Sequence, residues 1–206
     1  MPDDTPTLNA SALLIVDMQN DFVRPGAPMA VPDALGTVAV QRRLLDAFRA
    51  KQLPVLYTRF LSTPTHSLLW NWSPTCAPPT CACHKGFMRR YSDQAAELDC
   101  SAVIDELRPL PDEPVVEKYG YGGFHDTELH GLLQRLGVSS LVITGTVTQI
   151  CVEETAREAF HFGYQTTVVA DGVSSFAPEL QAATLQNFAM KFGWVVDSQT
   201  LLSALA

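Results

Sequence analysis

The chain has 206 residues, 47% of them apolar and 17% charged, and this balance predicts a single globular domain over residues 1–206 with a sizeable core. Its net charge of −8 argues against a nucleic-acid partner, because binding to a phosphate backbone requires a basic surface. No apolar run is long enough to predict a membrane span. Five cysteines without a secretory signal predict reduced thiols in a cytoplasmic protein.

Strands and helices alternate along the chain. Short apolar runs predict strands at residues 12–17, 54–60, 114–118, 141–144, 166–170 and 194–196. Apolar residues at helical spacing predict helices at residues 37–50, 101–108, 127–136, 152–162, 178–192 and 200–205. We expect the irregular segment 61–91 to form a lid or an interface. The pattern predicts an α/β fold, a doubly wound (Rossmann-like), mostly parallel six-stranded sheet with helices on both faces.

Three reactive side chains follow predicted strands. Asp17 closes the first strand, Lys118 closes the third, and Cys151 stands just beyond the fourth, at the start of a helix. Separately they are consistent with a turn former, a solvated lysine and a small core cysteine. In a sheet of this class, however, ligands bind at the carboxyl ends of the strands, where the three would meet.

Together these three residues predict nucleophilic catalysis without histidine. The helix N-terminus favours a Cys151 thiolate, and its N–H groups can bind an oxyanion. Asp17 takes the thiol proton and passes it to the leaving amine, while Lys118 stabilises both anions. Water activated by the same carboxylate then cleaves the thioester.

Four segments resemble the isochorismatase-like cysteine hydrolase superfamily, also called the nicotinamidase/isochorismatase family. They are ALLIVDMQNDF at 12–22, VEKYGYGGFHDTELHGLLQRLGV at 116–138, LVITGTVTQICVEETAREAFHFGY at 141–164 and VVADGVSS at 168–175. The resemblance covers most of the chain and implies a doubly wound sheet with a catalytic triad of Asp17, Lys118 and Cys151. It also implies a cis peptide bond between Thr146 and Val147, with the amides of Val147 and Cys151 directed at the oxyanion.

Departures from the family pattern bear on the substrate. Nicotinamidases of the family carry an Asp-x-His metal site after the second strand, and residues 57–66 lack that spacing, so we predict no metal and no cofactor. Isochorismatases as a rule lack the cysteine, so Cys151 favours cleavage of a C–N bond. The segments GYGGF and FGWVVD resemble ureidoacrylate, biuret and N-carbamoyl amidohydrolases. We therefore expect hydrolysis of a small ureido or carbamoyl amide. A nicotinamidase-type or isochorismatase-type hydrolase and a non-catalytic binding protein are the alternatives.

The candidate substrate-binding residues lie near the same strand ends: Phe22, Arg59, Tyr121, Phe124 and Gln149. Arg59 would meet a substrate carboxylate or carbonyl, unless it is a surface arginine. Tyr121 and Phe124 would form the pocket wall, unless they pack beneath their loop. Residues 19–21 are expected to hold the turn after Asp17.

Two features of segment 61–91 stay open. The first is the cluster Cys76, Cys81, Cys83 and His84, which fits no paired Cys-x-x-Cys pattern well and permits a structural metal, a disulfide or reduced thiols. The second is the role of Trp70 and Trp72, which could form a lid or a subunit contact. The resemblance suggests a homodimer or homotetramer with a small-molecule amide as its partner, and we expect neither nucleic acid nor membrane to bind.

Overall fold

The computed structural model describes residues 8–206. Six strands form one sheet: β1 (Ser11–Val16), β2 (Val55–Phe60), β5 (Val115–Lys118), β6 (Ser140–Thr146), β7 (Gln165–Ser174) and β8 (Trp194–Val196). Their order is β5-β2-β1-β6-β7-β8, and every pairing is parallel. From β1 the chain adds β2 and β5 on one side of the sheet. It then crosses back to place β6 on the other side of β1, followed by β7 and β8. This topology confirms the doubly wound α/β class and places the switch in strand order between β1 and β6.

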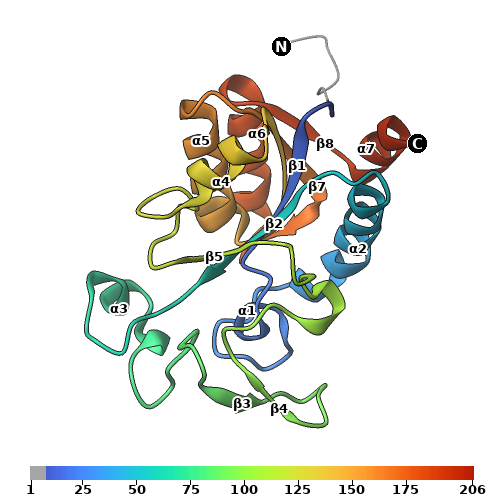
Figure 1. The fold of residues 1–206 in the computed structure, drawn as a ribbon. Coiled ribbons are helices and arrows are strands. Elements are labelled where there is room, and N and C mark those ends of the chain that lie inside the picture. Colours follow the sequence, from blue (N-terminus) through green and yellow to red (C-terminus); the bar gives the residue numbers. More distant parts are fainter. Residues whose placement is uncertain (1–7) are drawn as a thin grey trace.

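Helices cover both faces of the sheet (Figure 1). One face is covered by α2 (Ala34–Ala50) and α7 (Ser198–Leu205), and the other by α4 (Leu129–Arg135), α5 (Glu153–His161) and α6 (Pro178–Lys191). All six residues of β1 are buried, because alternate side chains enter the two cores. Leu13 and Ile15 face the first core, and Leu14 and Val16 face the second. No helix within residues 8–206 combines the length and the apolar character that a membrane crossing requires.

The predicted helix over residues 101–108 is wrong, because only a short 3-10 turn, η2 (Asp105–Leu107), forms there. Two of its backbone groups bond outside the segment. The carbonyl of Ala102 accepts from Asn20 N at 3.0 Å, and Ile104 N donates to Met18 O at 2.9 Å. The segment is thus used to hold the chain that follows β1.

Segment 61–91 contains more regular structure than its composition indicates. It holds a short helix α3 (Leu68–Trp72), a 3-10 turn η1 (Pro74–Cys76) and strand β3 (Met88–Arg90), which pairs antiparallel with β4 (Glu97–Asp99). A further short helix, α1 (Asn20–Val23), follows β1. These elements have three to five residues each, too few for hydrophobic periodicity to reveal them.

A glycine sets the close approach of the two central strands. Gly145 of β6 pairs with Val16 of β1, and its φ of +119° is a conformation that side chains with a Cβ rarely adopt. A Cβ at this position would collide with the carbonyl oxygen of Val16. The contact fixes the ends of β1 and β6 side by side, immediately before Asp17 and the segment that leads to Cys151.

Replacing Gly145 with alanine should therefore lower the free energy of unfolding by about 2 kcal/mol or more, because backbone must move to admit the Cβ. Gly36 in α2 is the matched control, since a Cβ there meets no atom within 4 Å. Gly36→Ala should be neutral or stabilising by up to about 1 kcal/mol. Urea unfolding of both variants measures the difference, and equal values would contradict the packing described here.

Candidate active site

A buried ion pair joins the ends of two strands that are not neighbours in the sheet. Asp17, directly after β1, and Lys118, the last residue of β5, are both fully buried, with Lys118 Nζ 2.7 Å from Asp17 Oδ2. Strand β2 lies between them, and its Thr58 hydroxyl donates to Asp17 Oδ1 at 2.7 Å. Lys118 crosses the end of β2 with its Nζ 5.5 Å from the centre of the Phe60 ring.

The backbone completes the surroundings of the lysine. Lys118 Nζ donates to the carbonyl oxygens of Gly120 at 3.1 Å and Tyr121 at 2.9 Å. Burial alone would lower the pKa of Lys118, but the negative charge of Asp17, together with Cys151, raises it above its usual value. Lys118 is therefore a permanent cation at the base of the site.

Cys151 completes the group on the other side of the switch point. It lies in a π-helical turn, η3 (Thr148–Val152), that connects β6 to α5, and its thiol is close enough to Asp17 and Lys118 for both charges to act on its pKa. Burial raises the pKa of the Cys151 thiol to about 12, although the charge of Lys118 opposes the effect. Burial thus favours the protonated thiol, and the carboxylate of Asp17 lies beside it.

The structure also places the two amides that the resemblance assigns to the oxyanion. The peptide bond between Thr146 and Val147 is cis. The carbonyl of Val147 accepts from the amides of Ile150 and Val152, at 3.1 Å each, which holds the η3 turn against the end of β6. Val147 and Cys151 both line the same cavity.

This cavity has a volume of about 450 Å³, and Cys151 reaches its surface. Its lining comes from α1, the chain after it, the end of β2, segment 72–75, the loop after β5, the η3 turn and the loop after β7. The lining residues are Phe22, Pro28, Met29, Ala30, Phe60, Trp72, Ser73, Pro74, Thr75, Tyr121, Val147, Ile150, Cys151 and Phe176. Of the candidate substrate-binding residues, Phe22 and Tyr121 therefore lie at the cavity.

Arg59 and Gln149 are not among the lining residues. Arg59 forms an ion pair with Glu117, its direct partner across β2 and β5. Gln149 accepts a hydrogen bond from Ser175 Oγ at 2.7 Å. Both side chains thus bind neighbouring protein groups and fasten the elements around the site.

Phe124 packs beneath the glycine-rich loop and also lies outside the cavity lining. Its ring stacks on Phe162, with 5.2 Å between ring centres. The loop binds α5 through two backbone amides, Gly123 N to Thr155 Oγ1 at 2.9 Å and Phe124 N to Glu158 Oε2 at 2.8 Å. The helix that follows Cys151 therefore also holds the loop whose carbonyls bind Lys118.

Several site residues escaped the sequence reasoning. Thr58 carried a usable signal, because it is a polar residue within an apolar strand next to the strand that Asp17 closes. No sequence signal marked Ser73, Pro74 or Thr75, since their segment has no periodic pattern. Gln19 holds the turn as expected: its side-chain amide bonds both the N–H and the carbonyl of Phe60, at 2.7 and 2.8 Å.

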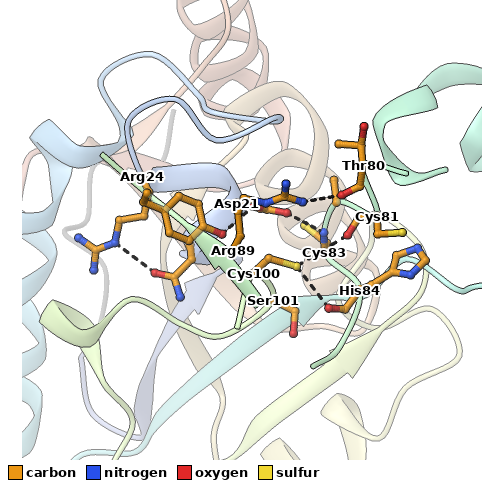
Figure 2. Close-up of polar contacts among 12 residues, drawn as sticks. Asp21, Arg24, Thr80, Cys81, Cys83, His84, Arg89, Cys100 and Ser101 are labelled. Atoms are coloured by element: carbon orange, nitrogen blue, oxygen red, sulfur yellow. Dashed lines mark hydrogen bonds and ion pairs between the residues drawn. The ribbon is translucent and has the colours of Figure 1, made fainter. Parts of the chain in front are cut away.

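A second buried carboxylate anchors the irregular segment behind the cavity wall. Figure 2 shows Arg89, Cys83 and Cys100 gathered around Asp21 of α1. Asp21 Oδ1 accepts from Arg89 Nε at 2.9 Å and from the Tyr91 hydroxyl at 2.7 Å, and Oδ2 accepts from Cys83 N at 3.0 Å. These bonds fix the segment after β2 against the helix that carries Phe22.

The cysteine cluster is part of this packing. Cys76, Cys81, Cys83 and Cys100 are free thiols, and His84 Nε2 lies 2.9 Å from the carbonyl oxygen of Cys76. Across residues 8–206, no three His, Cys, Asp or Glu side chains are grouped to hold a metal ion. The residues after β2 therefore do not fit the metal site of nicotinamidases, and no step of the chemistry below uses a metal.

Comparisons with known proteins show which proteins the chain resembles. A family model described as the isochorismatase domain matches residues 11–200. Ureidoacrylate amidohydrolase RutB of Methylobacterium radiotolerans is 35% identical over 94% of this chain and 78% of its own length, and nicotinamidase 3 of Arabidopsis thaliana is 32% identical over 97% and 91%. The crystal structure of N-carbamoylsarcosine amidase from Thermoplasma acidophilum is 30% identical, with a TM-score of 0.71 over 91% of this chain and 96% of that one.

Asp21→Asn should lower the free energy of unfolding by about 3 kcal/mol, because Arg89 loses its buried counter-charge. Asp46→Asn is the control: Asp46 pairs with Arg42 on the exposed face of α2, and its loss should cost only about 0.5 kcal/mol. Urea unfolding measures both changes. A loss at Asp21 as small as that at Asp46 would show that this carboxylate does not anchor the segment.

Proposed function

The chain belongs to the isochorismatase family, and we propose that it is a cysteine hydrolase that cleaves the C–N bond of a small amide through a thioester on Cys151. Its amidohydrolase relatives support a hydrolase of non-peptide C–N bonds. The observation that carries the proposal is the buried Asp17–Lys118 ion pair beside Cys151, which itself reaches the surface of a cavity of small-molecule size.

The first half of the reaction forms the thioester. As Cys151 Sγ attacks the amide carbonyl carbon, Asp17 accepts the thiol proton, so that the thiolate forms only as it reacts. The amides of Val147 and Cys151 hold the negative oxygen of the tetrahedral intermediate. Asp17 then gives its proton to the departing nitrogen, the C–N bond breaks, and ammonia or an amine leaves.

The second half returns the site to its starting state. Asp17, again a carboxylate, takes a proton from a water molecule that attacks the thioester carbonyl. The C–S bond breaks, the acid product leaves, and the proton returns to the Cys151 sulfur. Lys118 remains charged throughout and holds Asp17 in place, so its contribution is orientation and charge balance.

The relatives also support a substrate class. Ureidoacrylate amidohydrolase and N-carbamoylsarcosine amidase are named for ureido and carbamoyl compounds, and we propose an amide of this kind here. Nicotinamide is the alternative that the nicotinamidase relative supports, although the residues after β2 do not fit its metal site. We further propose a homo-oligomer, which the exposed side chains of Leu68 and Trp72 on α3 support.

Cys151→Ala should reduce hydrolysis by about 10³-fold or more while leaving the fold intact, because the nucleophile is lost. Cys81→Ala is the matched control, since that thiol takes no part in the site and its removal should leave activity near that of the unchanged enzyme. Ammonia release from a panel of small amides measures both. In the unchanged enzyme, acid quenching during turnover should trap an acyl group on the peptide that contains Cys151, detected by mass spectrometry. An active Cys151→Ala enzyme would rule out the proposed chemistry.

A further inference from the structure

The walls of the active-site cavity are uncharged and rich in aromatic rings. Every described residue that lines the cavity has an uncharged side chain. Five of them are aromatic and stand around Cys151: Phe22, Phe60, Trp72, Tyr121 and Phe176. Apart from Cys151, the polar groups of the lining side chains are the phenol of Tyr121, the indole N–H of Trp72 and the hydroxyls of Ser73 and Thr75. The lining thus offers hydrogen bonds to a neutral group and no counter-charge to an ion.

Five cations in and around the site already have acidic partners. Lys118, at the base of the site, pairs with Asp17. In the surrounding segments Arg24 pairs with Glu106 and Asp93, Arg89 pairs with Asp21, and Arg59 and Lys85 share Glu117. The whole chain also carries a net charge of −8, which adds an unfavourable potential for anions.

A carboxylate bound in this cavity would lose water and gain no counter-ion, which is strongly unfavourable in an apolar site. A flat apolar group would instead exchange water for contact with aromatic faces. We propose, given the cysteine hydrolase function above, that the substrate is an uncharged amide with an apolar, preferably aromatic, substituent, and not an amide that carries a carboxylate.

A neutral substrate would distinguish the chain from its ureidoacrylate amidohydrolase relatives. The name of ureidoacrylate amidohydrolase specifies an acid as its substrate. Arg59, the residue best placed in the sequence to bind such an acid, is paired with Glu117 and lies outside the cavity lining. The proposed substrate keeps the carbamoyl or ureido group that reacts with Cys151. It differs from ureidoacrylate in its substituent, which is apolar and carries no carboxylate.

Matched substrates test the inference directly. Succinamate is compared with 4-methylpentanamide, and 3-ureidopropionate with 3-methylbutylurea, because in each pair an isopropyl group replaces the carboxylate at nearly constant size. 3-Phenylpropanamide adds the aromatic substituent. We expect kcat/KM for ammonia release to be at least about tenfold higher for each neutral partner, and highest for the aromatic amide. An equal or higher kcat/KM for the acids would overturn the inference.

A charge placed in the wall gives an independent test. Thr75 lines the cavity and is half-buried, so Thr75→Arg introduces a cation at that point, and Thr75→Gln is the uncharged control. The ratio of kcat/KM for succinamate over 4-methylpentanamide should rise about tenfold in Thr75→Arg and stay unchanged in Thr75→Gln. An unchanged ratio in Thr75→Arg would mean that wall charge does not set the preference, against the inference.

The two proposals fail in different ways. If the acids are preferred and hydrolysis still requires Cys151, the substrate inference is wrong and the cysteine mechanism stands. If hydrolysis of any substrate persists in Cys151→Ala, the mechanism itself is wrong, and the substrate inference that rests on it falls with it.

Discussion

The structure depends on an ion pair that is fully removed from water. Asp17 and Lys118 lie 2.7 Å apart with no exposed surface. Asp17 also accepts a hydrogen bond from Thr58, and Lys118 donates to two backbone carbonyls. Desolvation makes such a pair a weak source of net stability. In the proposed mechanism its place beside the thiol gives it a chemical use, because it supplies a fixed carboxylate to accept a proton in a site without histidine.

The rest of the fold brings three distant parts of the chain to this pair. Gly145 allows β1 and β6 to approach closely, which puts Cys151 next to Asp17 across the switch in strand order. Helix α5 then follows Cys151 and binds the glycine-rich loop through Thr155 and Glu158. That loop carries the carbonyls that hold Lys118, so the nucleophile and the cation are positioned by one continuous set of contacts. Asp21 fixes the remaining wall in the same manner, with Arg89 as its counter-charge.

The sequence predicts the fold and the reactive group better than it predicts the walls. The sequence is enough to group Asp17, Lys118 and Cys151, because each follows a predicted strand and parallel strands in such a sheet carry their ligand-binding residues at the same edge. The ion pair of Arg59 could not be predicted, because identifying Glu117 as its partner requires the register between β2 and β5. The wall at Ser73 and Thr75 comes from short turns. Hydrogen bonds such as Ala82 N to Thr75 O, at 3.0 Å, hold these turns and leave no periodic pattern in the sequence.

The proposed mechanism requires Asp17 to act as the base for a thiol that rests in its protonated form. The most direct measurement compares the rate of alkylation of Cys151 by iodoacetamide at pH 7 in the unchanged enzyme and in Asp17→Asn, followed by mass spectrometry of the Cys151 peptide. Asp17 raises the pKa of this thiol through its charge, so charge alone predicts faster alkylation when it is neutralised. If Asp17 instead accepts the thiol proton during the reaction, its replacement by asparagine should slow alkylation. The account predicts slower alkylation in a folded Asp17→Asn protein, and alkylation that is as fast or faster would contradict it.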